Sequence, residues 1–245
     1  MADFLIFGGT TEGRLLAEFC AESRIYADIC VATDLGANLL PKSNYINIMT
    51  GKKNKDEIAE ILQKRRYIAI IDATHPYAAE VTENIKSVCG EIKYIRVKRN
   101  KVKLSGLIFD NLSEIITLCN NLSGNILSTL GSKESHEITK ISNFKERVWL
   151  RILPYNENIK QCVTAGLPKE HIIAANPPFS VEQNIAHIRL CRAEILLTKE
   201  SGSTGGYPEK VKACDICGTK LITLTRPPDD GISLEEVKKL LLTKG

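Results

Sequence analysis

A loop rich in Gly, Ser and Thr has the residue types of an anion-binding site. It covers residues 199–206, Lys-Glu-Ser-Gly-Ser-Thr-Gly-Gly, between an apolar segment and an expected helix that begins at Tyr207. Glycines allow a ligand to approach the backbone, hydroxyl groups donate hydrogen bonds, and lysines and a helix N-terminus attract negative charge. The candidate anion-binding residues are Lys199, Ser201, Gly202, Ser203, Thr204, Gly205, Gly206 and Lys210.

A second loop of similar design covers residues 8–14, Gly-Gly-Thr-Thr-Glu-Gly-Arg, after the first apolar segment. Doubly wound sheets bind phosphate at this position. The glycine spacing matches neither a strict dinucleotide fingerprint nor a P-loop, so a tight turn into a capped helix is the plain alternative. Asp34 could accept a ribose hydroxyl, although a loop Asp is more often a turn former. The candidate nucleotide-binding residues are Gly8, Gly9, Thr10, Thr11, Gly13, Arg14 and Asp34.

A third loop, residues 72–78, has the sequence Asp-Ala-Thr-His-Pro-Tyr-Ala and follows an expected central strand. Thr74, His75 and Tyr77 should therefore lie at the carboxyl edge of the sheet, where ligands bind. His75 could orient a ligand or donate a proton, and beside a helix start it could equally be a capping or packing residue. We expect Thr74 to contact a cofactor, and His75 and Tyr77 to be the candidate catalytic residues.

These loops are positioned by apolar runs that alternate with segments of helical period, as in parallel strands buried on both faces. We expect an α/β fold with two Rossmann-like domains of mainly parallel sheets, residues 1–100 and 101–245. The predicted strands are 4–7, 27–32, 45–49, 68–72, 92–97, 107–109, 125–128, 148–152, 172–174, 194–198 and 220–224. The predicted helices include 12–22, 56–64, 76–89, with Pro76 at the first helical position, and 234–242.

Composition excludes several classes of protein. The 245 residues carry a net charge of +4, which is too small for a dedicated nucleic-acid binder, and no apolar run approaches the length of a membrane span. The N-terminus has no signal-peptide pattern and the eight cysteines lie mostly in apolar segments, so we expect a reduced, cytoplasmic protein. The Cys214 and Cys217 pair lacks the second pair that zinc needs, and no metal site is expected.

One catalytic motif is rejected on geometry. Tyr94 and Lys98 match the Tyr-x-x-x-Lys dyad of short-chain dehydrogenases. In a helix such residues lie about 6 Å apart. In the strand expected here they lie roughly 13 Å apart, too far for the lysine to act on the tyrosine.

Five motifs in order resemble the precorrin-6A reductases of cobalamin biosynthesis. They are residues 8–14, residues 72–78, Arg-Ile-Leu-Pro at 151–154, residues 197–210, and Thr-Arg-Pro at 225–227. The resemblance covers nearly the whole chain. Residues 130–133 and 176–179 depart from the family pattern, and Pro177 removes a backbone donor that a glycine would keep.

The resemblance implies reduction of one double bond of precorrin-6A or cobalt-precorrin-6A by NADH or NADPH, with the active site in a cleft between the two domains. The first domain is then the nucleotide-binding candidate, with the cofactor at residues 9–14 and 74–77. The second is the candidate for binding the tetrapyrrole, whose carboxylates would meet the loop at 199–206 and Lys210. Asp34 favours NADH, while Thr33 and nearby basic residues could accept the 2′-phosphate of NADPH. The expected partner is this polycarboxylate tetrapyrrole, with no nucleic acid and no membrane.

Two alternatives from other classes stay open at this point. The protein could be a sensor that binds a dinucleotide without oxidising it. It could also be a transferase that acts on a tetrapyrrole and uses the first loop for S-adenosylmethionine. The proton donor, the presence of cobalt in the substrate and the oligomeric state, for which a monomer is one option, are not set by the sequence.

Overall fold

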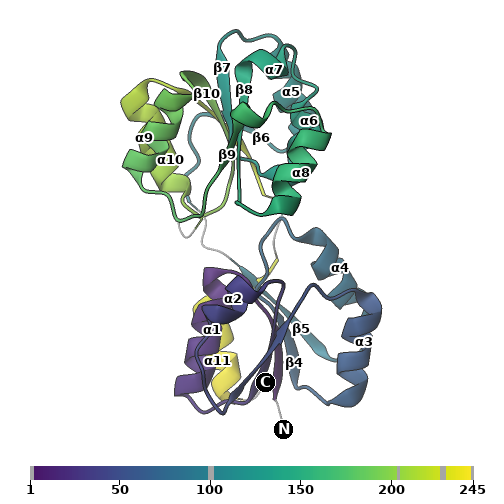
Figure 1. Ribbon diagram of the computed structural model, residues 1–245. Helices are drawn as coiled ribbons and strands as arrows, with labels where there is room; N and C mark the ends of the chain where they lie inside the picture. The colour runs from purple at the N-terminus through teal and green to yellow at the C-terminus, as the bar shows by residue number, and fades with distance from the viewer. Residues whose placement is uncertain (1–2, 99–101, 203–204, 227–229, 244–245) are drawn as a thin grey trace. The chain divides into compact units, whose positions relative to one another are not determined.

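The computed structural model describes residues 3–98, 102–202, 205–226 and 230–243 (Figure 1). Two compact units divide the chain, each with one six-stranded sheet. Unit 1 contains residues 1–100 together with 227–245, and unit 2 contains residues 101–226. The α/β class with mainly parallel sheets is confirmed, because every strand pair recorded in either sheet is parallel.

The sheet of unit 1 has the strand order β12-β5-β4-β1-β2-β3. Its strands are β1 (Phe4–Phe7), β2 (Ala27–Val31), β3 (Ile46–Thr50), β4 (Ala69–Asp72), β5 (Lys93–Lys98) and β12 (Ile232–Ser233). Its helices are α1 (Thr11–Glu22), α2 (Asp34–Asn38), α3 (Lys55–Lys64), α4 (Ala79–Val88) and α11 (Leu234–Thr243).

Side chains of β1 show how this sheet is buried on both faces. Phe4 and Ile6 belong to the core cluster that contains residues of α1 and α11, whereas Leu5 and Phe7 belong to the cluster with residues of α3 and α4. Successive side chains of a strand point to opposite faces, so an unbroken apolar run is required wherever both faces are covered. Figure 1 shows α1 and α11 on one face and α3 and α4 on the other.

The sheet of unit 2 has the order β6-β11-β10-β7-β8-β9. Its strands are β6 (Leu107–Phe109), β7 (Asn125–Ser128), β8 (Val148–Ile152), β9 (Ile172–Ala174), β10 (Ala193–Lys199) and β11 (Lys220–Leu224). Its α-helices are α5 (Leu112–Asn120), α6 (Ser135–Ile138), α7 (Phe144–Arg147), α8 (Asn156–Thr164), α9 (Val181–Leu190) and α10 (Tyr207–Cys217), and its 3₁₀ turns are η1 (Ser132–Glu134) and η2 (Lys169–His171).

The two sheets share one plan. In unit 1, β1, β2 and β3 lie side by side in chain order, and β4 then pairs with the other edge of β1. In unit 2, β7, β8 and β9 lie side by side in the same way, and β10 pairs with the other edge of β7. The strand order therefore reverses between β1 and β4 and between β7 and β10. Ligands of open α/β sheets bind at such a switch point, beyond the carboxyl ends of the strands. The sixth strand differs in origin, because β12 comes from the end of the chain and β6 comes from the segment that precedes β7.

The expected boundary of the second domain, 101–245, needs a correction. Strand β12 pairs with β5, and Val237 and Leu241 of α11 are buried in the same cluster as Leu16 of α1. These apolar side chains lose contact with water only against unit 1, which therefore includes the end of the chain. Pro76 is likewise not the first residue of a helix, since α4 begins at Ala79. Among the described residues, no helix is long and apolar enough to cross a membrane.

Candidate functional site

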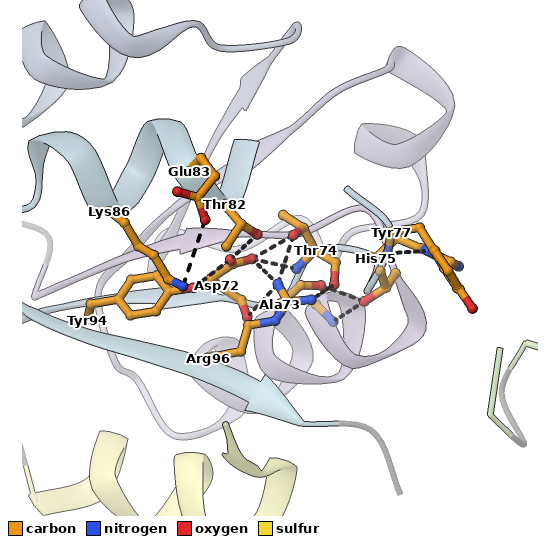
Figure 2. Close-up of polar contacts among 12 residues, drawn as sticks. Asp72, Ala73, Thr74, His75, Tyr77, Thr82, Glu83, Lys86, Tyr94 and Arg96 are labelled. Atoms are coloured by element: carbon orange, nitrogen blue, oxygen red, sulfur yellow. Dashed lines mark hydrogen bonds and ion pairs between the residues drawn. The ribbon is translucent and has the colours of Figure 1, made fainter. Parts of the chain in front are cut away.

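Asp72 is the last residue of β4 and is fully buried among hydrogen-bond donors (Figure 2). Its Oδ1 accepts hydrogen bonds from the Thr74 backbone N–H at 3.0 Å and from the Thr74 hydroxyl at 2.6 Å. Its Oδ2 accepts from the Thr82 hydroxyl at 2.7 Å and from the Tyr94 hydroxyl at 2.9 Å. Arg96 Nη1 forms an ion pair with Oδ1 at 2.5 Å. We call these five residues the Asp72 cluster.

The Asp72 cluster holds the carboxylate in its charged form. Burial alone would raise the pKa of Asp72, but the positive charge of Arg96 and the hydrogen bonds from Thr74 and Thr82 lower it below its usual value. A carboxylate that is both paired and hydrogen-bonded is the stable form in such surroundings. The negative charge of Asp72 is therefore a fixed part of this site.

The same cluster fixes the backbone of the third loop. Arg96 Nη1 donates to the Thr74 hydroxyl at 2.9 Å, and Arg96 Nη2 donates to the Thr74 carbonyl at 3.1 Å. From the first loop, the Thr10 hydroxyl donates to the Ala73 carbonyl at 2.7 Å. The loops that follow β1 and β4 are thus joined directly at the switch point of unit 1.

His75 and Tyr77 follow this anchored segment, and their side chains point away from the Asp72 cluster (Figure 2). His75 is exposed and Tyr77 is half-buried. The Tyr77 backbone N–H donates to His75 Nδ1 at 3.3 Å, and the two ring centroids lie 5.7 Å apart. Because Nδ1 accepts a hydrogen bond, the neutral imidazole carries its proton on Nε2. His75 can therefore present a proton donor at the carboxyl edge of the sheet.

The first loop turns tightly into a capped helix. Thr10 caps α1, because its hydroxyl accepts a hydrogen bond from the Gly13 N–H at 3.2 Å. Gly9 has a φ of +97° and no atom lies within 4 Å of its Cβ position, whereas a Cβ at Gly13 would lie 2.7 Å from the Gly8 Cα. Glycine is thus required at 13 for close packing, and Gly9 leaves the backbone open to a ligand.

Three other predicted nucleotide-binding residues lie near the same edge. Thr11 is the first residue of α1, and Arg14 pairs with Glu18 one turn further along this helix. Asp34 is exposed in the first turn of α2, which Thr33 caps through the Gly36 N–H. Asp34 was expected in a loop; it begins a short helix after β2, the strand beside β1.

In unit 2, the loop that follows β10 lies at the second switch point. Lys199 Nζ donates to Glu134 Oε1 at 2.7 Å, which joins this loop to the η1 turn after β7. The Ser201 hydroxyl donates to the Gly205 carbonyl at 2.8 Å, and Gly206 precedes α10 in the left-handed region with a φ of +73°. Gly202 is buried, and Ser203 and Thr204 lie outside the described residues.

Comparison with known proteins decides the family. The sequence model of the family described as "Precorrin-6x reductase CbiJ/CobK" matches residues 3–242. The chain belongs to this family.

Individual reductases of the family agree with this result. The chain is 33% identical over 230 residues to a cobalt-precorrin-6A reductase of Methanothermobacter thermautotrophicus, covering 91% of this chain and 76% of that protein. It is 29% identical to a cobalt-precorrin-6A reductase of Priestia megaterium, covering 91% of this chain and 90% of the relative. A solved structure of CobK precorrin-6A reductase superposes with a TM-score of 0.76 at 22% identity, covering 100% of this chain and 98% of that one, which supports the shared fold.

Within this reductase, sequence reasoning missed three members of the Asp72 cluster: Thr82, Tyr94 and Arg96. Tyr94 was noted only for a dyad with Lys98, and both residues do lie on a strand, β5, as the rejection of that dyad required. The missing signal was the strand pairing, since Asp72 lies opposite Arg96 in the register of β4 and β5. That register becomes readable only once β5 is placed beside β4.

A cavity of about 650 Å³ in unit 1 adjoins this cluster between α4, β5 and the start of β12. Tyr94 and Arg96 line it and also contact Asp72, while Lys86 and Lys93 add positive charge at its wall. Pro76 of the third loop lines the same cavity. The cavity is therefore lined both by members of the Asp72 cluster and by the loop that carries His75.

Proposed function

We propose that this protein reduces one double bond of the cobalt-precorrin-6A or precorrin-6A macrocycle to the 6B form, with NADH or NADPH as the reductant. The observation that carries the proposal is the family match over residues 3–242. As a member of this reductase family, the protein is an oxidoreductase of cobalamin biosynthesis that acts on a CH–CH group. Both relatives described above are named cobalt-precorrin-6A reductases, so we favour the cobalt-loaded substrate.

The first loop is our proposed site for the cofactor pyrophosphate. The open position at Gly9, the left-handed backbone there and the N-terminus of the 12-residue helix α1 fit a phosphate group. When bound, the cofactor supplies a hydride. The carboxylate of Asp34 would repel a 2′-phosphate, so we favour NADH over NADPH.

The third loop is our proposed source of the proton. A hydride added to one carbon of a conjugated system leaves negative charge that a proton must neutralise at another atom. His75 Nε2–H and the Tyr77 hydroxyl are the candidate donors. The Asp72 cluster would position both by fixing the backbone of Thr74, since a general acid is effective only when it is held within hydrogen-bond reach of the accepting atom.

The loop at 199–206 and α10 are our proposed receptors for substrate carboxylates. Precorrin macrocycles carry many acetate and propionate groups, which require several anion sites. In unit 2, Lys199 is engaged with Glu134, so a carboxylate at Lys199 would compete with this ion pair.

Our test of the activity follows anaerobic oxidation of NADH and of NADPH at the nicotinamide absorbance band. Enzymatically made precorrin-6A and its cobalt complex are offered separately with each nucleotide. We expect oxidation with the cobalt complex and NADH, together with a macrocycle heavier by two hydrogens. Tight nucleotide binding without oxidation in any pairing would contradict the proposal and favour a dinucleotide sensor.

We also place this reaction in the cytoplasm. All eight cysteines are free thiols. Burial raises the pKa of six of them to about 11 or about 12: Cys20, Cys30, Cys119, Cys162, Cys191 and Cys214. Free thiols are typical of proteins in a reducing compartment. Fractionation of the native host would test the location.

A further inference from the structure

Two buried cations in unit 2, Arg151 and Lys210, have no acidic partner among the described residues. Arg151, on β8, is 5% exposed, and Lys210, in the second turn of α10, is 8% exposed. Lys210 makes neither a hydrogen bond nor an ion pair within the described part of the chain. A buried charge without a compensating charge is costly, so this arrangement indicates that an anion belongs here.

The contacts of Arg151 are all with neutral groups. Its Nη1 donates to Asn184 Oδ1 at 2.9 Å and to His187 Nδ1 at 3.1 Å, and its guanidinium lies 4.0 Å from the Phe179 ring centroid. These contacts fix the plane of the guanidinium. In the described structure Nε and Nη2 make no hydrogen bond, and this pair of nitrogens is an edge by which Arg binds a carboxylate through two parallel hydrogen bonds.

Lys210 shares the layer that contains Arg151. The α9 and α10 helices pack together on one face of the sheet of unit 2 (Figure 1). Arg151 reaches toward α9, and its charge is close enough to lower the pKa of Lys210. On α10, Lys210 lies on the same face as the buried residues Tyr207 and Cys214.

The N-terminus of α10 adds a third source of positive potential. This helix has 11 residues, and Gly206 precedes it without a side-chain capping hydrogen bond. The charge of Glu209 acts on Lys210, its neighbour in the sequence, but the two residues form no ion pair. The Oε2 atom of Glu209 is buried without a hydrogen-bond partner in the described structure. The two cations and the helix N-terminus therefore leave an excess of positive charge near the carboxyl end of β8.

We propose that Arg151 and Lys210 together form a receptor for one carboxylate group of the substrate, in the layer between β8 and the α9 and α10 helices. This inference rests on the proposed function, because it assigns one of the several substrate carboxylates to a specific pair of side chains. Arg151 binds the carboxylate through its Nε and Nη2 edge, and Lys210 provides the second charge.

Binding at this receptor takes up a proton. Burial, followed by the charge of Arg151, lowers the pKa of Lys210 to about 7, while Glu209 and Cys214 act in the opposite direction. On α9, the pKa of His187 is lowered by burial and by Arg151, so His187 adds no positive charge at neutral pH. A bound carboxylate favours the charged form of Lys210. Affinity should therefore decrease as the pH rises above 7.

The experiment measures binding of uroporphyrin III, a polycarboxylate tetrapyrrole, to the full-length protein by quenching of porphyrin fluorescence. The variants are Arg151→Gln, Lys210→Met and Lys210→Arg, and the matched control is Lys212→Met on the exposed side of α10. We expect at least tenfold weaker binding for Arg151→Gln and Lys210→Met, no change for Lys212→Met, and recovery in Lys210→Arg. In Lys210→Arg, the loss of affinity between pH 6 and pH 9 should also disappear.

A second measurement follows Lys210 itself. Competitive acetylation with mass spectrometry gives the pKa of this lysine with and without uroporphyrin III, and we expect the bound form to be at least one unit higher. An unchanged lysine pKa, or porphyrin binding that is unaffected in Lys210→Met, would overturn the proposal even if Arg151→Gln failed to fold. Neither measurement needs a nicotinamide or turnover, so failure of the reductase assay would be distinct from failure of the receptor.

Discussion

The Asp72 cluster of unit 1 and the cation pair of unit 2 bury charge in opposite ways. Asp72 is surrounded by one cation and three hydroxyl donors, all from unit 1. Arg151 and Lys210 are also buried, but neither forms an ion pair with an acid among the described residues, and the hydrogen bonds of Arg151 go to Asn184 and His187. A charge that the fold itself satisfies serves to position the backbone, whereas a charge left without its counterpart is explained by a ligand.

Removing the cation of the Asp72 cluster should produce the largest effect. In Arg96→Met, Asp72 keeps its burial but loses its ion pair, which we expect to destabilise unit 1 by about 3–5 kcal/mol. Hydrogen exchange of β1 and β4 peptides in urea, read by mass spectrometry, measures this change. Lys93→Met, at an exposed position of the same strand, is the control. A loss below about 1 kcal/mol would show that Asp72 does not depend on Arg96.

Removing a cation of unit 2 should increase its stability, the opposite of the effect expected in unit 1. Lys210 makes no ion pair within the described structure, so Lys210→Met should stabilise unit 2 by about 1–3 kcal/mol at pH 6. The folded pKa is about 7 against an ordinary value of 10.5, so the unfolded chain binds more protons between these values. Wild-type stability therefore rises across this range, and the advantage of the variant shrinks.

The chain offers a direct probe for this second change. Trp149 is the single tryptophan and lies on β8, so its fluorescence follows the unfolding of unit 2. Urea titrations of wild type and Lys210→Met give the difference in the free energy of unfolding between the two proteins at pH 6 and at pH 9. Destabilisation by Lys210→Met at pH 6 would mean that Lys210 has a compensating partner.

Low pH should destabilise unit 1 through the Asp72 cluster. The pKa of Asp72 is lowered in the folded state, so its contribution is present above its ordinary value of 3.8 and is lost as the pH falls through the folded pKa. We expect the stability of unit 1 to decrease below about pH 4, with a shallower decrease in Asp72→Asn. Hydrogen exchange of β4 peptides between pH 5 and pH 2.5 provides the comparison. If the stability of unit 1 decreased equally steeply with falling pH in wild type and in Asp72→Asn, a lowered pKa of Asp72 would be refuted.

The smallest effect is expected at the ion pair of Lys199 and Glu134. Both side chains are partly exposed, at 13% and 26%, so Glu134→Gln should cost unit 2 only about 0.5 kcal/mol. The variant removes the negative charge that faces Lys199, so uroporphyrin III should bind two- to threefold more tightly. Trp149 fluorescence in urea and porphyrin quenching measure the two quantities. Weaker binding would mean that Glu134 orients Lys199 for the ligand.

Periodicity predicted most of the fold. The predicted strands at 4–7, 125–128 and 148–152 match β1, β7 and β8 residue for residue, because strands covered on both faces are mostly apolar. Strand β12 was missed because two residues carry too little pattern to identify a strand. The return of α11 to unit 1 depends on contacts of Val237 and Leu241 that no local signal contains.

Site residues were predictable where they come directly after a strand in the sequence. The loops after β1, β4 and β10 were identified by their glycines, hydroxyls and His75. The partners of Asp72 were not, because Arg96 and Tyr94 come from a neighbouring strand. The burial of Lys210 had a readable signal: it lies three residues after Tyr207 and four before Cys214, on the apolar side of α10. A lysine at such a position indicates a buried charge.

The return of the chain to unit 1 has a consequence for synthesis on the ribosome. Unit 2 is complete once residue 226 has emerged, but the sheet of unit 1 lacks β12 and its core lacks Val237 and Leu241 until the segment after residue 226 has followed. Domains usually fold from the N-terminus as they emerge. Here the unit whose strands emerge first is finished after unit 2, so the nucleotide-binding candidate is fully formed only after the second unit is complete.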